Sequence, residues 1–150
     1  MQWAVLPLKR YSEFSGRSRR KEFWLFMLLM LIISMVAGMI DRALGMSGMF
    51  GGLYGPVSLL AFLALLTPQF SVSVRRLHDT GRSGWWVLLG FLPAVTVALS
   101  MMTGIEVLNL LSLVALVLLY FFVLDGTRGP NQYGPDPKAD SAAAAAPQAS

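Results

Sequence analysis

The chain has 150 residues, of which 55% are hydrophobic and only 13% are charged, and its mean hydropathy is +0.61. An ordinary soluble domain is about 25% charged, and a soluble chain this apolar would expose large hydrophobic patches to water. The absence of cysteine excludes disulfides, thiolate metal sites and a cysteine nucleophile. We therefore predict an integral membrane protein, in which the placement of the net charge of +4 matters more than its size.

Four apolar segments are long enough to cross a bilayer as helices. Even the shorter ones would reach about 27 Å at 1.5 Å per residue, close to the roughly 30 Å of a hydrocarbon core. Their apolar residues do not alternate with polar ones, which favours helices over barrel strands. Pro68 and Pro93 fall inside the second and third segments, and we expect each to kink its helix because it removes a backbone donor. The segments are 23–40, 53–74, 85–102 and 105–124.

The basic residues predict how these helices are oriented. With four spans, eleven of the twelve Lys and Arg residues fall on one side of the membrane and only Arg42 falls on the other. The positive-inside rule places the eleven in the cytoplasm. The apolar run after Lys21 has no clean cleavage site, so we expect it to be retained rather than removed as a signal peptide. The predicted fold is an all-α membrane protein with four transmembrane helices, in a bacterial inner (plasma) membrane, with both termini cytoplasmic.

The chain divides into four stretches. Residues 1–22 form a basic cytoplasmic segment, 23–124 the four-helix transmembrane domain, 125–137 a cytoplasmic Gly/Pro motif and 138–150 an Ala-rich tail that we expect to be disordered. Aromatic and leucine residues beside Lys9 and Arg10 predict a short amphipathic helix lying among the lipid headgroups, although Pro7 interrupts it.

Three polar blocks fall on the predicted cytoplasmic side and carry a family resemblance. They are Gly16 to Trp24 with the pattern G-R-x-x-R-x-E-[FY]-W, Arg75 to Trp86 with R-R-L-H-D-x-x-[RK]-S-G-W-W, and Gly126 to Pro137 with G-x-x-G-x-N-x-[YF]-G-x-D-P. In this order the blocks resemble the bacterial membrane family catalogued as domain of unknown function 805, over roughly residues 10–137. The closing block departs slightly, with Gln132 where the family often has Arg. The resemblance implies a small inner-membrane protein and implies no reaction.

These blocks supply a candidate polar cluster on the cytoplasmic face. Its arginines have two interpretations: they fix the helices and bind anionic lipid headgroups, or they form a specific phosphate pocket together with helix N-termini. We expect the aspartates to pair with Arg75, Arg76 or Arg128. The candidate residues are Arg17, Arg75, Arg76, His78, Asp79, Arg82 and Asp125.

His78 is the only histidine of the chain. A zinc site needs three or four ligands, so His78 would have to be joined by Asp79, Asp125 and Asp136. The simpler interpretation is that His78 and Asp79 fix the loop by hydrogen bonds, with Asp79 or Ser83 capping the third helix. We favour the simpler interpretation.

No phosphate-binding loop, H-E-x-x-H pattern or nucleophile elbow is present, so we predict a protein that is not an enzyme and needs no cofactor or metal. We expect no binding of nucleic acid, because the basic segments are accounted for by membrane topology. The leading hypothesis is a structural or interaction module whose cytoplasmic face binds anionic lipid or a protein partner. The alternative is a small oligomeric permease or channel, and a third is an enzyme that uses His78 and Asp79 on a lipid headgroup. Small residues spaced four apart, at Gly90, Ala94 and Ala98, suit packing within the bundle or a homo-oligomer seam.

The predicted outer side carries few charges. Asp41 closes the first helix, Arg42 follows it, and Glu106 begins the fourth. We expect Arg42 to pair with one of these two carboxylates.

Overall fold

The computed structural model describes residues 2–49, 54–104 and 113–139, and within these ranges the regular structure is helical, with one isolated bridge between Asn131 and Gly134. The prediction of an all-α protein is therefore confirmed for the described residues. The helices are α1 (Gln2–Lys9), α2 (Arg20–Ala43), α3 (Pro56–Asp79), the 3-10 helix η1 (Gly84–Phe91), α4 (Leu92–Thr103) and α5 (Ala115–Val123).

The chain forms two compact units. The first comprises residues 1–14 and 21–72, and the second comprises residues 15–20 and 73–150. The short basic stretch 15–20 therefore belongs with the C-terminal half of the chain rather than with its sequence neighbours. The helix α3 runs from the first unit into the second.

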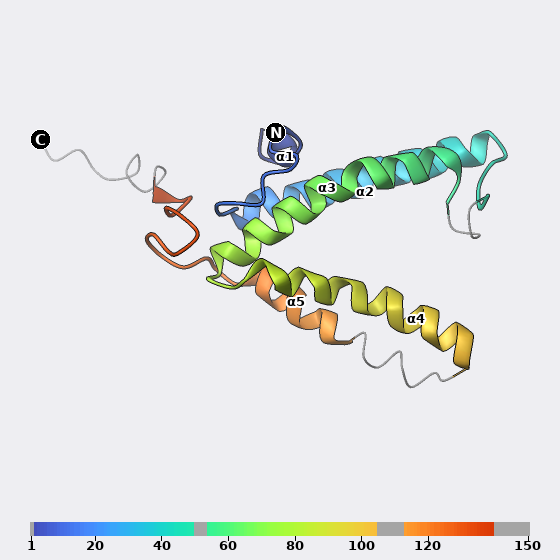
Figure 1. Cartoon of the computed structure of the whole chain (residues 1–150). Helices are drawn as coiled ribbons and strands as arrows, with labels where there is room; N and C mark the ends of the chain where they lie inside the picture. The colour runs from blue at the N-terminus through green and yellow to red at the C-terminus, as the bar shows by residue number, and fades with distance from the viewer. Residues whose placement is uncertain (1, 50–53, 105–112, 140–150) are drawn as a thin grey trace, which may run out of the picture. The chain divides into compact units, whose positions relative to one another are not determined.

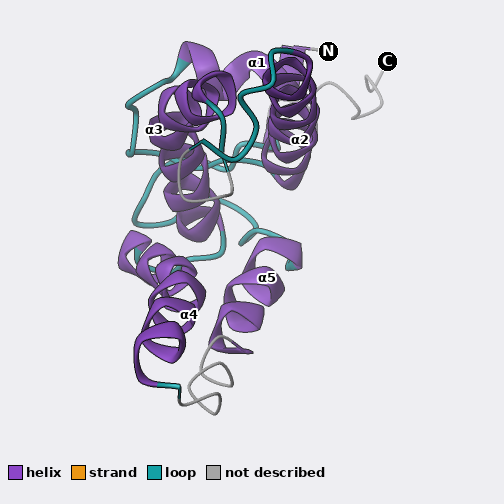
Figure 2. Cartoon of the chain, turned by 90° about the vertical axis from the view of Figure 1, so that its right-hand side faces the viewer, coloured by secondary structure: helices purple, strands orange, loops and turns teal. Residues whose placement is uncertain are grey.

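In the first unit, α2 and α3 run side by side (Figures 1 and 2). Each has 24 residues, or about 36 Å of helix, which exceeds the roughly 30 Å of a bilayer core. Both are long and apolar enough to cross a membrane. Large apolar side chains of α2 remain exposed, with Leu31 at 57% and Met39 at 61%. Exposing such an apolar surface to water is unfavourable, whereas contact with lipid is not.

The N-terminal segment is attached to α3 within the same unit. The helix α1 forms with Pro7 inside it, so the proline does not interrupt the predicted short helix. After it, the Tyr11 hydroxyl donates to the carbonyl of Ala64 at 2.5 Å. The Ser71 hydroxyl lies 3.2 Å from the carbonyl of Arg10 and 2.5 Å from that of Glu13. These bonds hold the segment along the helix.

In the second unit, η1 and α5 pack on the last turns of α3. Leu77 of α3 forms a buried cluster with Leu118 and Phe121 of α5. A Cβ atom added to Gly90 would meet a methyl group of Leu118 at 3.6 Å. One residue of the small-residue pattern therefore packs inside the unit.

The third apolar segment differs from the expectation of a single kinked helix. It consists of η1 up to Phe91 and α4 from Leu92. Pro93 lies in the first turn of α4, where the missing N–H has no helical partner to lose. The start of the fourth segment with Glu106 and the predicted disordered tail from residue 140 onward lie outside the described residues.

Candidate functional site: a clasp of buried arginines

The last turn of α3 carries a buried carboxylate that is held by two arginines. Arg17 donates from Nε to Oδ1 of Asp79 at 3.0 Å, and Arg76 donates from Nη1 to Oδ2 of Asp79. The three side chains are at most 2% exposed. Arg76 lies one turn before Asp79 on α3, whereas Arg17 comes from the segment 15–20. Buried ions need partners of this kind because desolvation penalises each charge strongly.

Backbone carbonyl groups accept hydrogen bonds from the other nitrogen atoms of the two guanidinium groups. Arg17 donates to Gly129 at 2.6 Å and to Thr127 at 2.5 Å. Arg76 donates to Leu124 and, at 3.3 Å, to Phe122. We call Arg17, Arg76, Asp79 and these four carbonyl groups the Asp79 clasp. It ties three separate parts of the second unit together: segment 15–20, the end of α3 and the stretch that begins at the end of α5.

Close backbone contacts surround the clasp. The N–H of Thr127 donates to the carbonyl of Asp79 at 2.8 Å, and the N–H of Ser18 donates to the carbonyl of Arg75 at 3.0 Å. A Cβ atom on Gly126 would lie 2.1 Å from Oδ2 of Asp79. Only glycine fits at this position without displacing the carboxylate.

His78 lies next to the clasp and fixes the same loops. Its ring stacks on Tyr133 with centroids 3.9 Å apart, and its Nδ1 lies 3.2 Å from the carbonyl of Gly16. Its own carbonyl accepts a hydrogen bond from Asn131 at 2.9 Å. Within the described residues, no group of three or more His, Asp or Glu side chains is placed to hold a metal ion. The geometry of His78 is that of a loop-fixing residue.

All seven candidate site residues lie in the second unit, but they divide by role. Arg17, Arg76 and Asp79 contact one another directly. Arg75 is fully buried. Arg82 stacks on Phe121, with its guanidinium carbon 3.8 Å from the ring centroid, and next to it the Ser83 hydroxyl caps η1 by accepting from the N–H of Trp85.

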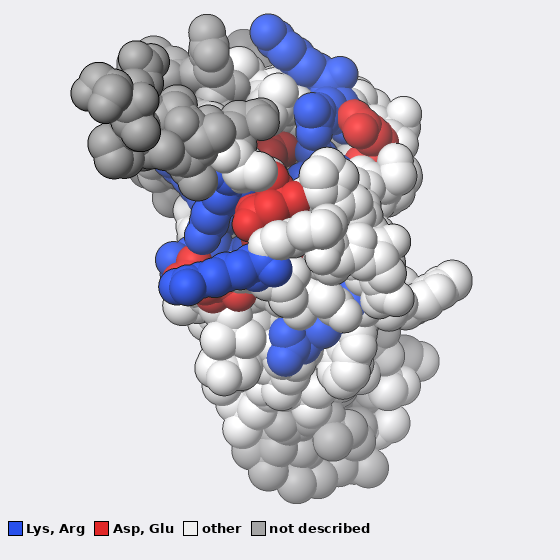
Figure 3. Space-filling model, turned by 90° about the vertical axis from the view of Figure 1, so that its left-hand side faces the viewer, with Lys and Arg blue, Asp and Glu red and all other residues white. Residues whose placement is uncertain are grey.

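Asp125 remains exposed and pairs differently from the expectation. Its carboxylate lies 2.6 Å from Arg20 and 2.9 Å from Lys138, rather than beside Arg75, Arg76 or Arg128. Figure 3 shows Lys and Arg side chains lying directly beside Asp and Glu side chains on one face. Sequence reasoning also missed the carbonyl partners of the clasp, since side-chain chemistry gives no signal for them.

We expect the protein to lose stability in acid because of two carboxyl groups in the Gly/Pro motif 125–137. The Lys138 side chain holds the pKa of Asp125 below its ordinary value, and the N–H groups of Lys138 and Gly129 do the same for the pKa of Asp136. The contribution of each such carboxyl group to the free energy of unfolding is fully present above its unfolded pKa of about 3.9. It is lost as the pH falls through the lower pKa of the folded state. Detergent-unfolding midpoints at pH 5 and pH 3, compared for the wild type and an Asp125→Asn/Asp136→Asn variant, should show the smaller acid loss in the variant. An equal loss in both proteins would contradict this assignment.

A second polar site lies in the first unit, where α2 ends. Both carboxylate oxygens of Asp41 accept from the start of α3, from the N–H of Val57 at 2.9 Å and that of Ser58 at 2.8 Å. A Cβ atom on Gly55 would lie 2.3 Å from the carboxyl carbon of Asp41. The side chain therefore caps the next helix in place of a residue adjacent in sequence.

Replacing Asp41 by Ala should destabilise the α2–α3 hairpin, because two part-buried N–H groups of α3 would lose their acceptor. Asp41→Asn keeps one carbonyl acceptor and should lose less. Unfolding by sodium dodecyl sulfate in mixed micelles, followed by circular dichroism, measures both. Equal midpoints for Asp41→Ala and the wild type would contradict the capping role.

Comparison with known proteins identifies the family. The model of the family described as "Protein of unknown function (DUF805)" matches residues 11–135. The chain belongs to this family. Inner membrane protein YhaI of Escherichia coli K12 is 40% identical over 138 residues, which cover 92% of this chain and 97% of that protein. Inner membrane protein YhaH of the same organism is 37% identical over 143 residues, covering 92% and 98%. No solved structure matches.

Membership in the DUF805 family and the two long apolar helices place this chain in a bacterial inner membrane. The resemblance found in the three polar blocks is thus confirmed. In this DUF805 protein, residues from all three blocks meet in and around the Asp79 clasp. The description of the family names no reaction.

Proposed function

We propose that this chain is a four-span inner-membrane protein with both termini in the cytoplasm, and that it works as a non-enzymatic structural and interaction module. The observation that carries the proposal is the closed Asp79 clasp. Its carboxylate faces two guanidinium groups and its guanidinium groups face backbone carbonyls, all in a buried site. Because the carboxylate and each guanidinium nitrogen already have a partner inside the protein, the site suits holding loops together better than binding a phosphate or transferring a proton.

The partner that we propose for the cytoplasmic face is anionic lipid. Lys21 and Arg128 are exposed, in contrast to the buried arginines of the clasp. Each exposed cation near an anionic surface contributes about 1 kcal/mol. The clasp would hold the stretch that carries Arg128, and both cations would bind the headgroups.

Reporter fusions test the four-span topology. A periplasm-active phosphatase fused after residue 48 or 104 should be active, and one fused after residue 82 or 139 should be inactive. The fusion at 104 is decisive, because a chain with only the two spans α2 and α3 would leave it in the cytoplasm. Activity at 48 and 139 together, or inactivity at 104, would contradict the proposed topology.

Nanodiscs test the proposed lipid partner. The thermal midpoint of the wild type should rise when anionic lipid is added to zwitterionic lipid, and the rise should shrink in a Lys21→Gln/Arg128→Gln variant. The control is Gln132→Ala, an exposed neutral change. Equal rises in all three proteins would contradict the proposal, and solute flux through proteoliposomes of the wild type would favour the oligomeric permease or channel instead.

A further inference from the structure

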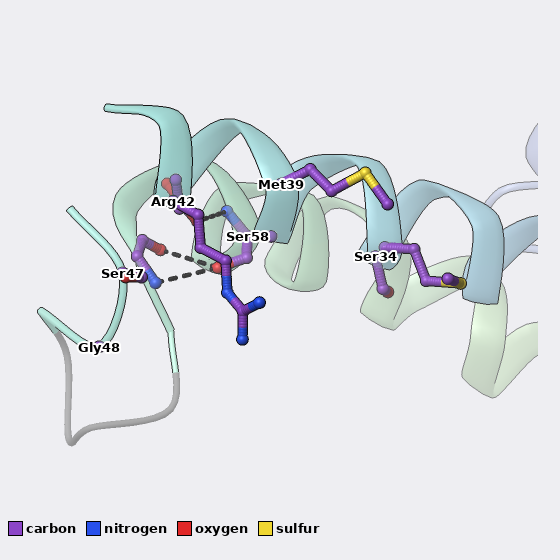
Figure 4. A pocket seen from close by; sticks show the side chains of 10 residues that line it. Ser34, Met39, Arg42, Ser47, Gly48 and Ser58 are labelled. Atoms are coloured by element: carbon purple, nitrogen blue, oxygen red, sulfur yellow. Dashed lines mark hydrogen bonds between the residues drawn. The ribbon is translucent and has the colours of Figure 1, made fainter. Parts of the chain in front are cut away.

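A pocket of about 510 Å³ follows the last turns of α2 in the first unit (Figure 4). Met35, Gly38 and Met39 line its apolar part along the helix, and its polar lining includes Asp41, Arg42 and Ser47. A Cβ atom on Gly38 would meet nothing within 4 Å, so the missing side chain leaves the groove open. The pocket therefore has a cation at one end and an apolar groove along α2, which we call the apolar channel.

The cation of this pocket is available to a ligand. Asp41, its neighbour in sequence, uses both carboxylate oxygens on Val57 and Ser58. The expected pair between Arg42 and Asp41 does not form, and Glu106 lies outside the described residues. Among the residues that the structure describes, the Arg42 guanidinium makes no hydrogen bond or ion pair, and Figure 4 shows it pointing away from the ribbons.

The local charge favours an anion. The carboxylate of Asp41 faces the N-terminus of α3, whose dipole is equivalent to about half a positive charge. The full charge of Arg42 adds to this, so the polar end of the pocket is net positive. A guanidinium binds a phosphate with two parallel hydrogen bonds. The Ser47 hydroxyl at the same end can donate a further one.

We propose that this pocket binds one membrane phospholipid, with its phosphodiester on Arg42 and Ser47 and an acyl chain along Met39, Gly38 and Met35. The apolar channel distinguishes a lipid from a free anion, because inorganic phosphate would leave it empty. The inference rests on the proposed function in one respect, the placement of α2 across the bilayer. It adds a lipid site at the end of the α2–α3 hairpin opposite the predicted cytoplasmic face.

Native mass spectrometry of the full chain in mild detergent tests the site, with phosphatidylglycerol as the probe. The wild type should bind one phosphatidylglycerol, and Arg42→Gln should bind it about five- to tenfold more weakly. Arg42→Lys should bind with an affinity between those of the wild type and Arg42→Gln, because lysine keeps the charge but cannot form the two parallel hydrogen bonds. Gly38→Leu should lose the lipid by filling the channel, since its Cβ atom enters open space. Matched controls are Arg10→Gln for the loss of an exposed cation and Ala43→Leu for added bulk outside the pocket.

Either of two results would overturn the proposal, as would the absence of lipid binding by the wild type. One is equal binding by the wild type, Arg42→Gln and Gly38→Leu. The other is displacement of the lipid by an equal concentration of inorganic phosphate, which would indicate a simple anion site. Reporter fusions that give the four-span pattern while the lipid does not bind would refute the pocket alone. Lipid binding without the four-span reporter pattern would refute the topology alone.

Discussion

Replacing Asp79 by Ala should lower the free energy of unfolding by about 3–5 kcal/mol, the cost of removing one partner from a buried ion network. Two guanidinium groups, on side chains at most 2% exposed, would keep their charges without the carboxylate between them. Unfolding by sodium dodecyl sulfate in mixed micelles, followed by circular dichroism, measures the loss.

The matched control is Asp125→Ala, which removes an exposed carboxylate that also faces two cations. It should change stability little, because exposed ion pairs contribute little in water. A double cycle with Arg17→Ala should be strongly non-additive, since the two residues share one network. If Asp79→Ala and Asp125→Ala have the same small effect, the clasp does not stabilise the protein.

Replacing Gly126 by Ala should cost about 1–3 kcal/mol through overpacking. The new methyl group would lie 2.1 Å from Oδ2 of Asp79, and the carboxylate is held in place by Arg17 and Arg76. The same unfolding measurement applies. Gly38→Ala is the control, because its methyl group enters open space inside a helix, where alanine is intrinsically preferred.

The Gly126→Ala penalty should shrink in an Asp79→Ala background, where the shorter side chain leaves room for the methyl group. A penalty that is unchanged in that background would show that the strain comes from elsewhere in the loop. Wild-type stability of Gly126→Ala would contradict the close approach itself.

The sequence predicted the helices more completely than the contacts between polar residues. Unbroken apolar runs indicated α2 and α3, because lipid demands internally satisfied backbone and apolar side chains. The same runs did not indicate that the third segment changes at Phe91 from η1 to α4. Pro93 signalled a change in the helix, but a proline is compatible with either a kink or a helix start.

The sequence predicted which residues form the candidate cluster, but it predicted only part of how they pair. Arg17 and Asp79 are 62 residues apart in the chain, and no periodicity connects residues across such a distance. The carbonyl partners of Arg17 have no sequence signature at all. For Asp41, the expectation of a pair with Arg42 failed because the hairpin brings the N-terminus of α3 to its carboxylate, where backbone N–H groups compete successfully.

The most direct test of the Asp79 clasp is whether it joins the end of α3 to the C-terminal motif in native membranes. The chain has no cysteine, so His78→Cys/Tyr133→Cys, replacing two rings stacked 3.9 Å apart, introduces one defined pair. A short thiol crosslinker should join this pair efficiently, and should fail with His78→Cys/Thr103→Cys, whose second position ends α4. Adding Asp79→Ala should reduce the first crosslink. Equal crosslinking of both pairs, or no effect of Asp79→Ala, would contradict the account.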